Sequence, residues 1–448
     1  MFKKVLIPNR GEIALRIIRT CREMGIRTVL AYSQADAASL PARLADEKVC
    51  IGPPQARDSY LSIPAIMSAV DLSKADAVHP GYGFLAEDAN FASACESVGV
   101  KFIGPRTEVI ESLGNKLRAR EIAQKAGVPV VSGSRESVED NKELAKMAET
   151  VGYPVLLKAA AGGGGRGMKI VRNEDELSAA SNISRAEAKA AFGDGSIYIE
   201  KYFDNAKHVE IQILADEHGN IISLWDRECS VQRRFQKLIE ESPSSAVSPA
   251  VRTRLVESSI ALAKAAGYTN AGTVEFLLLE NGDFYFLEVN ARLQVEHPVT
   301  ESITGIDIIR EQILVASGKR LSLEQKNVPL NGHSFEARVN AEDPVKMSPC
   351  PGKVALFVPP GGYGVRVDSA LYSGYEVPSF YDSLIAKIIS RGKSREEARI
   401  RMLRALKECI VEGIQTNLSL LIKIFEHAEF ANGNFNTRFL ENTILKQK

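Results

Sequence analysis

The sequence lacks several features that mark whole classes of proteins. No apolar run among its 448 residues approaches the roughly 20 that a membrane-spanning helix needs. Its six cysteines form no Cys-x-x-Cys pair and no metal-ligand spacing, and most have apolar neighbours, as Cys50 has in Val49 and Ile51. We therefore expect reduced thiols in the core. Because the first residues also do not resemble a signal peptide, we expect a cytoplasmic protein.

An excess of charge of one sign is also missing. Lys plus Arg and Asp plus Glu both number 56, so no net field draws the protein to nucleic acid or to an acidic membrane. The basic cluster at residues 232–237 contains one aromatic residue, Phe235, and indicates an anion site rather than RNA binding. We expect neither nucleic acid nor a membrane as a partner.

Two common nucleotide-binding motifs are absent. The turn after the first predicted strand, from Pro8 to Glu12, lacks the Gly-x-Gly-x-x-Gly pattern of dinucleotide-binding folds. The segment Gly392 to Ser394 resembles the end of a Walker A loop, but Lys387 stands where that loop needs its first glycine. Dinucleotide-dependent enzymes and P-loop NTPases are therefore disfavoured.

The first hundred residues alternate between strand and helix patterns. Strands are predicted at residues 4–8, 27–33, 76–79 and 100–104, with a helix between the first two whose apolar face includes Ile13 and Ile17. Gly25 stands where the C-terminal cap of this helix belongs. This βαβ order predicts an α/β unit with a mostly parallel, doubly wound sheet.

The pattern changes from about Gly127. Short strands are predicted at residues 154–158, 168–171, 196–202, 209–214 and 221–225, interrupted by two helical stretches. This indicates an α+β nucleotide-clamping region that continues to about Gly318. The remainder is strand-rich, and it closes with a helix from Ser394 to about Val411.

A glycine-rich segment follows the strand that ends at Lys158. Four successive glycines, residues 162–165, leave backbone N–H groups free to surround phosphate oxygens, and Lys158 supplies positive charge. A flexible hairpin loop is an equally good interpretation of the same residues.

The most specific pattern is a predicted hairpin around Asn281 and Gly282, which are typical of a two-residue turn. Such a turn pairs Glu275 with Glu288, and alternation places Asn290 on the same face. Opposed carboxylates repel each other unless a cation lies between them. These hard oxygen ligands predict Mg²⁺ or Mn²⁺, shared with the phosphates of a nucleotide.

The alternation continues through Arg292, Gln294 and Glu296, whose intervening residues are apolar. A half-exposed strand gives the same pattern. We favour a catalytic site, because an arginine and an acid directly follow the predicted metal ligands. Lys116 and Arg338 also stand out, although each alone fits a surface residue.

Together these segments resemble the biotin carboxylase family over essentially the whole chain. The resemblance rests on residues 7–14, 79–87, 208–212, 232–234, 288–301 and 338–344, together with the glycine loop after Lys158. Carbamoyl-phosphate synthetases share the ATP-grasp core of this family but not this set of motifs. The resemblance implies an N-terminal domain at residues 1–114, an ATP-grasp domain at 115–318 with a mobile lid at about 130–204, and a C-terminal domain at 330–448.

The resemblance also implies roles for individual residues. The implied phosphate-binding and adenosine-binding residues are Lys116, Lys158, Gly163, Gly164, Gly165, Met168, Glu200, Lys201, Tyr202, Phe203, His208, Gln232 and Leu277. The implied metal ligands are Glu275, Glu288 and Asn290, which also contact the nucleotide. Bicarbonate would lie against Lys237, Arg292, Gln294 and Val295. Glu296 would act as the base, and Arg338 would stabilise the biotin oxyanion.

The implied reaction is the ATP-dependent carboxylation of biotin by bicarbonate through carboxyphosphate. The chain has no Met-Lys-Met biotin attachment motif. We therefore expect a separate biotin carboxyl carrier protein, separate carboxyltransferase subunits, and a homodimer, as is usual in the family. The parent complex stays open between acetyl-CoA carboxylase and a split pyruvate or 2-oxoglutarate carboxylase.

Three departures from the family pattern are visible. Phe235 stands where members often have histidine, Ala161 where some have glycine, and the segment around Thr437 resembles carboxylases other than the bacterial fatty-acid type.

Two other functions are alternatives to the leading one. The first is an ATP-grasp ligase that joins a carboxylate to an amine. The second is a regulatory ATP-binding module without chemistry. The presence of all four residues implied as catalytic, Lys237, Arg292, Glu296 and Arg338, disfavours this alternative.

Overall fold

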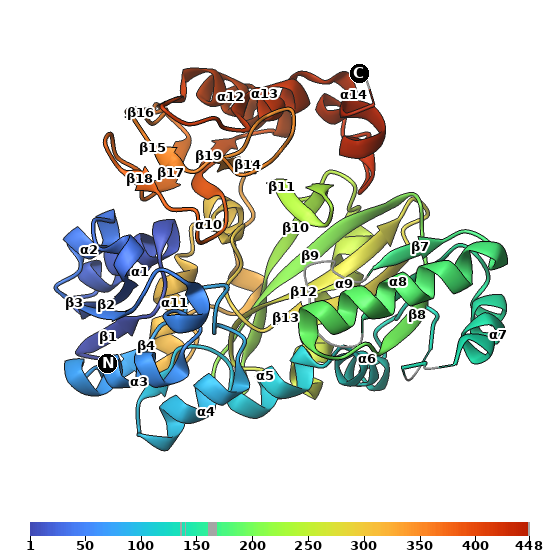
Figure 1. The fold of residues 1–448 in the computed structure, drawn as a ribbon, viewed down its shortest axis with the longest axis horizontal. Coiled ribbons are helices and arrows are strands. Elements are labelled where there is room, and N and C mark those ends of the chain that lie inside the picture. The colour runs from blue at the N-terminus through green and yellow to red at the C-terminus, as the bar shows by residue number, and fades with distance from the viewer. Residues whose placement is uncertain (135–136, 139, 160–167, 447–448) are drawn as a thin grey trace.

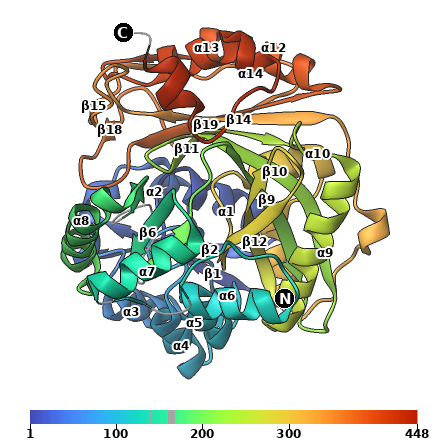
Figure 2. The same ribbon diagram turned by 90° about the vertical axis from the view of Figure 1, so that its right-hand side faces the viewer.

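The computed structural model describes residues 1–134, 137–138, 140–159 and 168–446. Figure 1 shows four parts: an N-terminal unit, a long central sheet, a lid on one side of that sheet, and a C-terminal unit above it. Turned by 90°, the C-terminal unit still lies above the other three (Figure 2).

The N-terminal unit contains a five-stranded sheet in the order β3-β2-β1-β4-β5, and all its strand pairs are parallel. This confirms the predicted doubly wound sheet. Ile13 and Ile17 of α1 are buried against it, and Gly25 (φ +70°) follows the end of that helix, as predicted. The elements are β1 (Lys4–Ile7), α1 (Gly11–Glu23), β2 (Arg27–Ser33), α2 (Leu40–Leu44), β3 (Glu47–Gly52), α3 (Ile63–Ser73), β4 (Ala77–Val78), α4 (Ala89–Ser97), β5 (Lys101–Phe102) and α5 (Thr107–Gly114).

The prediction that the cysteines lie in the core is wrong for Cys50, which is exposed. It lies on β3, an edge strand of the sheet whose side chains alternate between the core and solvent. Cys350 is only partly buried, whereas the other four cysteines are buried as expected.

The central part is built on an eight-stranded sheet in the order β13-β12-β9-β10-β11-β14-β19-β17, whose neighbouring strands are all antiparallel. Its last three strands come from the C-terminal unit, so the β11–β14 pair joins the two units through backbone hydrogen bonds. The central elements are α6 (Lys116–Lys125), β9 (Ala206–Ala215), β10 (Ile221–Arg233), β11 (Gln236–Ser242), α9 (Pro249–Ala265), β12 (Asn270–Leu279), β13 (Phe284–Asn290), α10 (His297–Thr304) and α11 (Ile308–Ala316).

The lid has a small hydrophobic core of its own, which includes Leu144, Val155, Leu177 and Ile199. Its three strands form a separate antiparallel sheet in the order β7-β6-β8, beside two helices (Figure 1). The lid elements are α7 (Asn141–Val151), β6 (Val155–Ala159), β7 (Lys169–Val171), α8 (Glu174–Phe192) and β8 (Ile197–Lys201).

The C-terminal unit packs two further helices against the end of the long sheet. The helix predicted from Ser394 is α12, for which Ser394 is the N-cap, but it ends at Glu408 because residues 410–412 form a strand. The elements are β14 (His333–Asn340), β15 (Gly352–Lys353), β16 (Leu356–Val358), β17 (Val365–Ser369), β18 (Glu376–Val377), β19 (Leu384–Gly392), α12 (Arg395–Glu408), β20 (Ile410–Glu412), α13 (Leu418–Glu426) and α14 (Ala428–Ala431).

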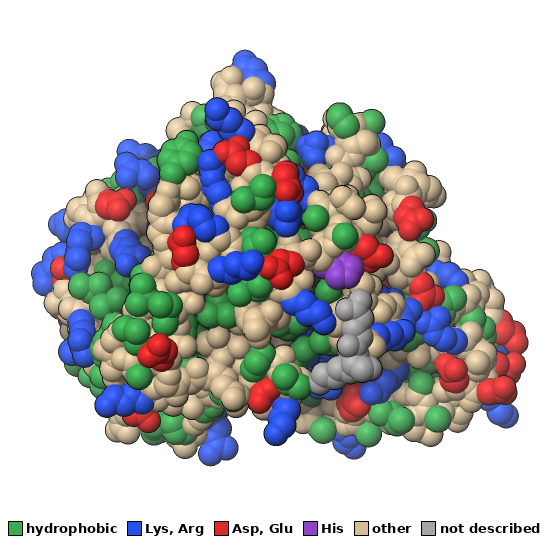
Figure 3. All heavy atoms as spheres, turned by 90° about the horizontal axis from the view of Figure 1, so that it is seen from above, with side chains coloured by type: hydrophobic (Ala, Val, Ile, Leu, Met, Phe, Trp, Pro, Cys, Tyr) green, Lys and Arg blue, Asp and Glu red, His purple; other side chains and the backbone are tan. Residues whose placement is uncertain are grey.

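Among the described residues, no helix combines the length and the apolar character that a bilayer crossing needs. On the face seen from above in Figure 3, acidic and basic side chains are interspersed, as the equal counts of the two charges suggest.

Candidate functional site

The β12–β13 hairpin carries the predicted metal ligands, but its turn differs from the prediction. Leu279 and Asp283 close a three-residue loop in which Gly282 (φ +84°), but not Asn281, has a positive φ. A two-residue turn of the predicted type needs positive φ at both central residues, so the predicted turn is wrong.

The predicted pairing of Glu275 with Glu288 is nevertheless confirmed. The loop shifts the register by one residue, and a β-bulge at Leu287 shifts it back, since Phe276 pairs with Phe286 while Glu275 pairs with Glu288. Without this bulge, Glu288 would point toward the core face on which Phe286 lies. The bulge therefore brings the second carboxylate to the site.

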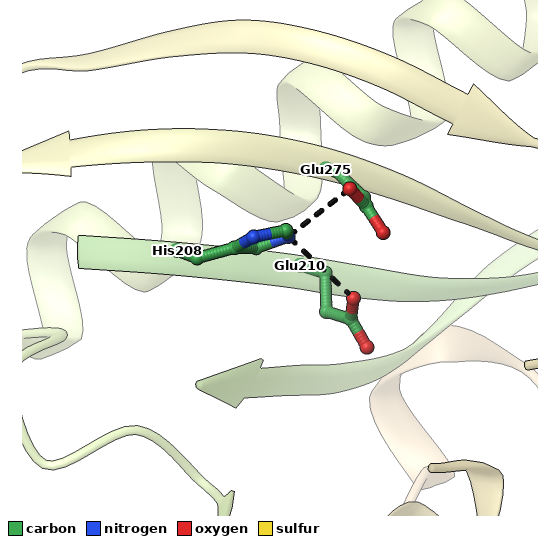
Figure 4. A group of neighbouring side chains, drawn as sticks. All are labelled: His208, Glu210 and Glu275. Carbon is green, nitrogen blue, oxygen red and sulfur yellow. Dashed lines mark ion pairs between the residues drawn. The ribbon is translucent and has the colours of Figure 1, made fainter. Parts of the chain in front are cut away.

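Glu275 lies at the centre of a hydrogen-bonded cluster. Its Oε1 accepts from Asn290 Nδ2 at 2.9 Å, from Gln294 Nε2 at 2.9 Å and from Lys237 Nζ at 2.8 Å. The His208 ring points between the carboxylates of Glu275 and Glu210, with its Nε2 3.1 Å from Glu275 Oε2 (Figure 4). Burial raises the pKa of Glu275, but Lys237 and His208 outweigh burial and hold this pKa well below its usual range.

Glu288 has the opposite balance. Burial raises the pKa of its carboxyl group, and the negative charge of Glu275 raises it further, against the opposing effect of Lys116. A bound cation would relieve this repulsion, so the oxygen donors of Glu275, Glu288 and Asn290 fit a hard divalent ion. Glu210 and His208 also approach Glu275 closely enough to share a metal, but Lys237 already contacts both carboxylates of that group.

Two lysines, Lys116 and Lys158, lie near enough to Glu288 to act on it electrostatically. Lys116 is the first residue of α6, a position fixed by the Asn115 cap, whose Oδ1 accepts from two backbone N–H groups at 3.1 Å. Lys158 is buried at the end of β6, with its Nζ 2.5 Å from Glu200 Oε2. Burial lowers the pKa of Lys158, but Glu200, Tyr198 and Glu288 together raise it above its usual range, so Lys158 remains charged. The predicted phosphate contacts at Gly163, Gly164 and Gly165 lie outside the described residues.

Two of the residues predicted to contact adenosine, His208 and Phe203, lie near Leu277. Leu277 pairs with His208 on β9 and with Tyr285 on β13, and the Tyr285 ring stacks on Phe203 with their centroids 5.3 Å apart. The Nζ of Lys201 donates to the backbone oxygens of residues 152 and 153. Met168 and Tyr202 are partly buried beside β7 and β8, respectively.

The β10–β11 hairpin brings Gln232 opposite Lys237. Its turn contains Arg234 (φ +46°) and Phe235 (φ +66°), both in a conformation that side chains disfavour. From this hairpin Lys237 Nζ reaches Glu210 Oε2 at 2.7 Å and Glu296 Oε1 at 2.7 Å, in addition to Glu275. The ammonium group therefore joins Glu275, a predicted metal ligand, to Glu296, the predicted base.

The alternating pattern predicted that the strand continues through residues 291–296. This prediction is wrong, because β13 ends at Asn290. Arg292 is held by Glu87, whose Oε2 accepts from its Nε at 2.7 Å, and by Asn290, whose Oδ1 accepts from its Nη2 at 2.8 Å. The oxygen of Val295 accepts from the buried Lys387 Nζ at 2.8 Å. Side chains from the N-terminal and C-terminal units therefore fix this irregular segment.

Glu296 and Arg338 are in direct contact. Arg338 Nη2 donates to Glu296 Oε2 at 2.8 Å, while Lys237 contacts the other oxygen of Glu296. Burial raises the pKa of Glu296, but Lys237 and then Arg338 lower it far more, so the group is ionised across the neutral range. The structure brings together all four residues implied as catalytic.

Sequence reasoning missed five residues that support this site. Glu210 lies two residues from His208 on β9, so strand alternation was a signal that it faces the site. Arg227 is fully buried and paired with Glu210. Glu87, Glu240 and Lys387 come from distant segments, and no local pattern identifies them. The missed residues are Glu87, Glu210, Arg227, Glu240 and Lys387.

Three family models match the chain. They are the biotin carboxylase N-terminal domain at residues 1–110, the ATP-binding domain of the carbamoyl-phosphate synthase L chain at residues 115–324, and the biotin carboxylase C-terminal domain at residues 336–442. Biotin carboxylase 1 of Bacillus subtilis (strain 168) is 53% identical over 443 residues, which cover 98% of both chains. This chain belongs to the biotin carboxylase family. Biotin carboxylases are ATP-dependent ligases, and the chain has the biotin carboxylase activity of that family.

Solved biotin carboxylase structures share the whole fold. The enzyme of Campylobacter jejuni, crystallised in complex with a β,γ-ATP compound, superposes with a TM-score of 0.97 at 47% identity, over 98% of this chain and 99% of that one. The biotin carboxylase domain of the Hydrogenobacter thermophilus 2-oxoglutarate carboxylase, solved as a dimer with MgADP, ADP and bicarbonate, gives 0.95 at 47% identity, over 98% and 97% of the two chains. A pyruvate carboxylase subunit of Methanothermobacter thermautotrophicus is 50% identical, over 98% of this chain and 90% of its own length.

Proposed function

We propose that the chain carboxylates biotin on a separate carrier protein, and that the reaction takes place at the cluster of Lys237, Glu296 and Arg338. The observation that carries the proposal is the position of Glu296, whose two oxygens contact Lys237 at 2.7 Å and Arg338 at 2.8 Å. A buried base flanked by two cations suits a reaction between an anionic substrate and an oxyanion.

ATP would bind between the lid and the β12–β13 hairpin. Lys116 and Lys158 lie next to Glu288 and would contact the phosphates, while Leu277 and Phe203 would contact the base. Glu275, Glu288 and Asn290 would hold Mg²⁺ or Mn²⁺. When bound, this ion neutralises charge on the phosphates. Closure of the lid would exclude water from a reactive intermediate.

Bicarbonate would lie against Lys237, Arg292, Gln294 and Val295. Arg292 is fixed by Glu87 and Asn290, so its guanidinium is oriented before the anion arrives. Glu296 would accept the bicarbonate proton, and the resulting oxyanion would attack the γ-phosphorus, with ADP leaving. A positioned general base of this kind contributes about 10²–10⁴-fold to a rate.

Biotin would react at the same end of the site. Carboxyphosphate would break down to CO₂ and phosphate, and the released phosphate is the strongest base that the reaction itself supplies. The ureido nitrogen of biotin would lose its proton to it and attack CO₂. Arg338, whose charge is permanent, would pair with the oxyanion formed on the ureido oxygen.

The proposed assembly contains a biotin carboxyl carrier protein, carboxyltransferase subunits and a homodimer of this chain in the cytoplasm. Acetyl-CoA carboxylase is the leading parent complex. Support for a pyruvate or 2-oxoglutarate carboxylase comes from the relatives that carry those names. Transfer of labelled carboxyl groups from the carboxylated carrier to acetyl-CoA, pyruvate or 2-oxoglutarate would distinguish these parents.

The reaction is tested by bicarbonate-dependent ATP hydrolysis with and without free biotin and Mg²⁺. We expect ADP release to require bicarbonate and the metal, and biotin to increase it. A lack of stimulation by biotin would end the proposal. Phosphate release that needed an amine and ignored biotin would favour a carboxylate–amine ligase instead.

A further inference from the structure

Arg338 is held from two sides by buried carboxylates. Its Nε donates to Glu240 Oε1 at 2.6 Å, while its Nη2 donates to Glu296 Oε2 at 2.8 Å. The proposed reaction uses Glu296 as a base and Arg338 as a cation, but it gives no role to Glu240. A fully buried carboxylate beside a catalytic arginine calls for an explanation, because burial disfavours its charge.

A second buried carboxyl group faces Glu240. Glu336 on β14 is the direct cross-strand partner of Glu240 on β11, and both side chains are 0% exposed. Opposed residues in an antiparallel pair have Cβ atoms only about 5 Å apart, so the two carboxyl groups lie within reach of each other. Among the described residues, Glu240 Oε2 and both carboxyl oxygens of Glu336 have no hydrogen-bond partner.

One proton gives partners to two of these three oxygens. A neutral carboxylic acid has an O–H group that must donate, and an ionised carboxylate has only acceptors. If Glu336 is the neutral acid, its O–H can donate to the free Oε2 of Glu240, and Glu240 Oε1 still accepts from Arg338. Each member of the pair then has a partner.

The charged groups around the pair favour this distribution. Arg338, Lys237, Lys387 and Glu296 act on it electrostatically, and the ammonium of Lys387 is already 3.0 Å from Glu12. Burial raises the pKa of Glu336 well above its usual range, and Lys387 only partly opposes this. Burial also raises the pKa of Glu240, but less than that of Glu336, because Arg338 pairs with Glu240 at 2.6 Å and opposes the rise. The proton therefore belongs on Glu336.

We propose that Glu240 is a positioning residue for Arg338, and that Glu336 is a neutral acid whose O–H donates a hydrogen bond to Glu240 Oε2. The proposal rests on the role given to Arg338 above. When Glu296 takes the proton of bicarbonate, it loses its charge and its hold on Arg338 Nη2 weakens. Glu240 remains anionic, and its Oε1 still lies 2.6 Å from both Nε and Nη2, so the guanidinium keeps its orientation while its side toward Glu296 becomes available to the biotin oxyanion.

Steady-state kinetics of four variants test the positioning role. We expect Glu240→Gln to lower the ratio of biotin-dependent to biotin-independent ATP turnover about tenfold or more, because Arg338 loses an anionic anchor. Glu336→Leu, which removes the donor to Glu240, should lower the ratio as well. Glu336→Gln keeps an N–H donor and should restore the ratio to within about threefold of the parent protein. Arg338→Gln serves as the reference for loss of the arginine itself.

If Glu240 and Glu336 had only a structural role, the variants would lose biotin-dependent and biotin-independent ATP turnover to the same extent. Glu336→Leu and Glu336→Gln would then have the same ratio of the two activities. Either of those outcomes overturns the positioning role. If Arg338→Gln kept its full biotin-dependent turnover, the role of Arg338, rather than that of the carboxyl pair, would be wrong.

Infrared difference spectroscopy tests the proton without reference to turnover. At neutral pH the parent protein minus Glu336→Gln should show one carboxylic-acid C=O band that shifts in D₂O, because a neutral acid is lost in the variant. Absence of that band would show Glu336 to be ionised and would overturn the assignment of the proton.

Discussion

The ammonium of Lys237 lies 2.7 Å from Oε1 of Glu296 and holds the proposed base in its ionised form. Burial raises the pKa of Glu296, and Lys237 and Arg338 together more than reverse this effect. A carboxylate with so low a pKa is a weak proton acceptor. Bicarbonate would compete for Lys237, weaken the hold of this ammonium on Glu296 and raise the pKa of Glu296 as the substrate binds. The base would thus become stronger only when its substrate is present.

The first prediction concerns removal of this base. Glu296→Gln should lower biotin-dependent turnover about 10²–10⁴-fold, the usual contribution of a general base. The affinity for ATP should stay within about threefold, because Glu296 is not among the residues proposed to contact the nucleotide. ADP release measures the first quantity and calorimetric titration with ATP the second. The exposed Glu217→Gln, which removes only a surface pair with Lys101, is the matched control. Full turnover by Glu296→Gln would exclude Glu296 as the base.

The second prediction concerns the repulsion between Glu275 and Glu288. Glu288→Gln removes one charge from this pair, so the ligand-free variant should be at least as stable as the parent protein. It should, however, lose most of the increase in melting temperature that Mg²⁺ with ATP produces, because that increase depends on the affinity of the bound ligand. The measurement is thermal unfolding with and without the ligands.

Two controls accompany this experiment. Glu280→Gln changes an exposed carboxylate on the same hairpin and should behave like the parent protein. Chelation of the metal should make the parent protein resemble Glu288→Gln. A variant that kept the full ligand-induced increase would remove Glu288 from the metal site.

The fold was predictable wherever apolar residues repeat clearly with the spacing of a strand or of a helix. The strands and first helix of the N-terminal unit follow from alternating and helical patterns in short windows. The continuous sheet through β11 and β14 was not predictable, because it joins residues about ninety positions apart and no local pattern reports such a pairing. The exposure of Cys50 has a similar cause, since the position of β3 at the sheet edge depends on strand order.

The site shows the same division. The Glu275–Glu288 pair was predicted from a turn that does not form, and the bulge at Leu287 compensates for the longer loop. The sequence offers no sign of that bulge. Glu87 and Lys387 hold the segment from Arg292 to Val295 from other units of the fold, so only the assembled structure reveals them.

The third prediction concerns a junction of three parts of the fold. Lys387 on β19 is fully buried, with its Nζ 3.0 Å from Glu12 Oε1 on α1 and 2.8 Å from the Val295 oxygen. Lys387→Met should destabilise the protein by about 3–5 kcal/mol, because Glu12 is left buried without its cation. It should also raise the KM for bicarbonate, since Val295 loses its anchor. Thermal unfolding and initial rates measure the two effects.

A double-mutant cycle separates this ion pair from loss of packing. Lys387→Met combined with Glu12→Gln should recover at least about 1 kcal/mol of stability relative to the sum of the single variants, because no buried charge is left alone. The KM for bicarbonate should stay high in the double variant, as the Val295 contact is still missing. If the stability changes of the two single variants simply added up in the double variant, Lys387 and Glu12 would not stabilise each other as an ion pair.

The fourth prediction is a pH dependence of stability. Glu241 on β11 is buried, and its Oε2 lies 2.7 Å from Arg395 Nε and 2.9 Å from His333 Nε2. Burial raises the pKa of Glu241, but His333 and Arg395 lower it below its usual value. A lowered folded-state pKa stabilises the protein above the unfolded-state pKa of about 4.3, and this contribution is lost as the pH falls through the folded-state value.

Arg395→Gln should therefore cost about 3 kcal/mol at about pH 7, and the difference from the parent protein should narrow below about pH 4. It should not vanish, because Arg395 also donates to the backbone oxygens of Phe430 and Ala431, and those hydrogen bonds do not titrate. Urea unfolding across this pH range measures the difference. Lys407→Gln on the same helix breaks only an exposed pair with Glu426 and should change stability by less than about 0.5 kcal/mol at every pH. A difference that stayed constant or widened on acidification would show that Glu241 does not titrate as proposed.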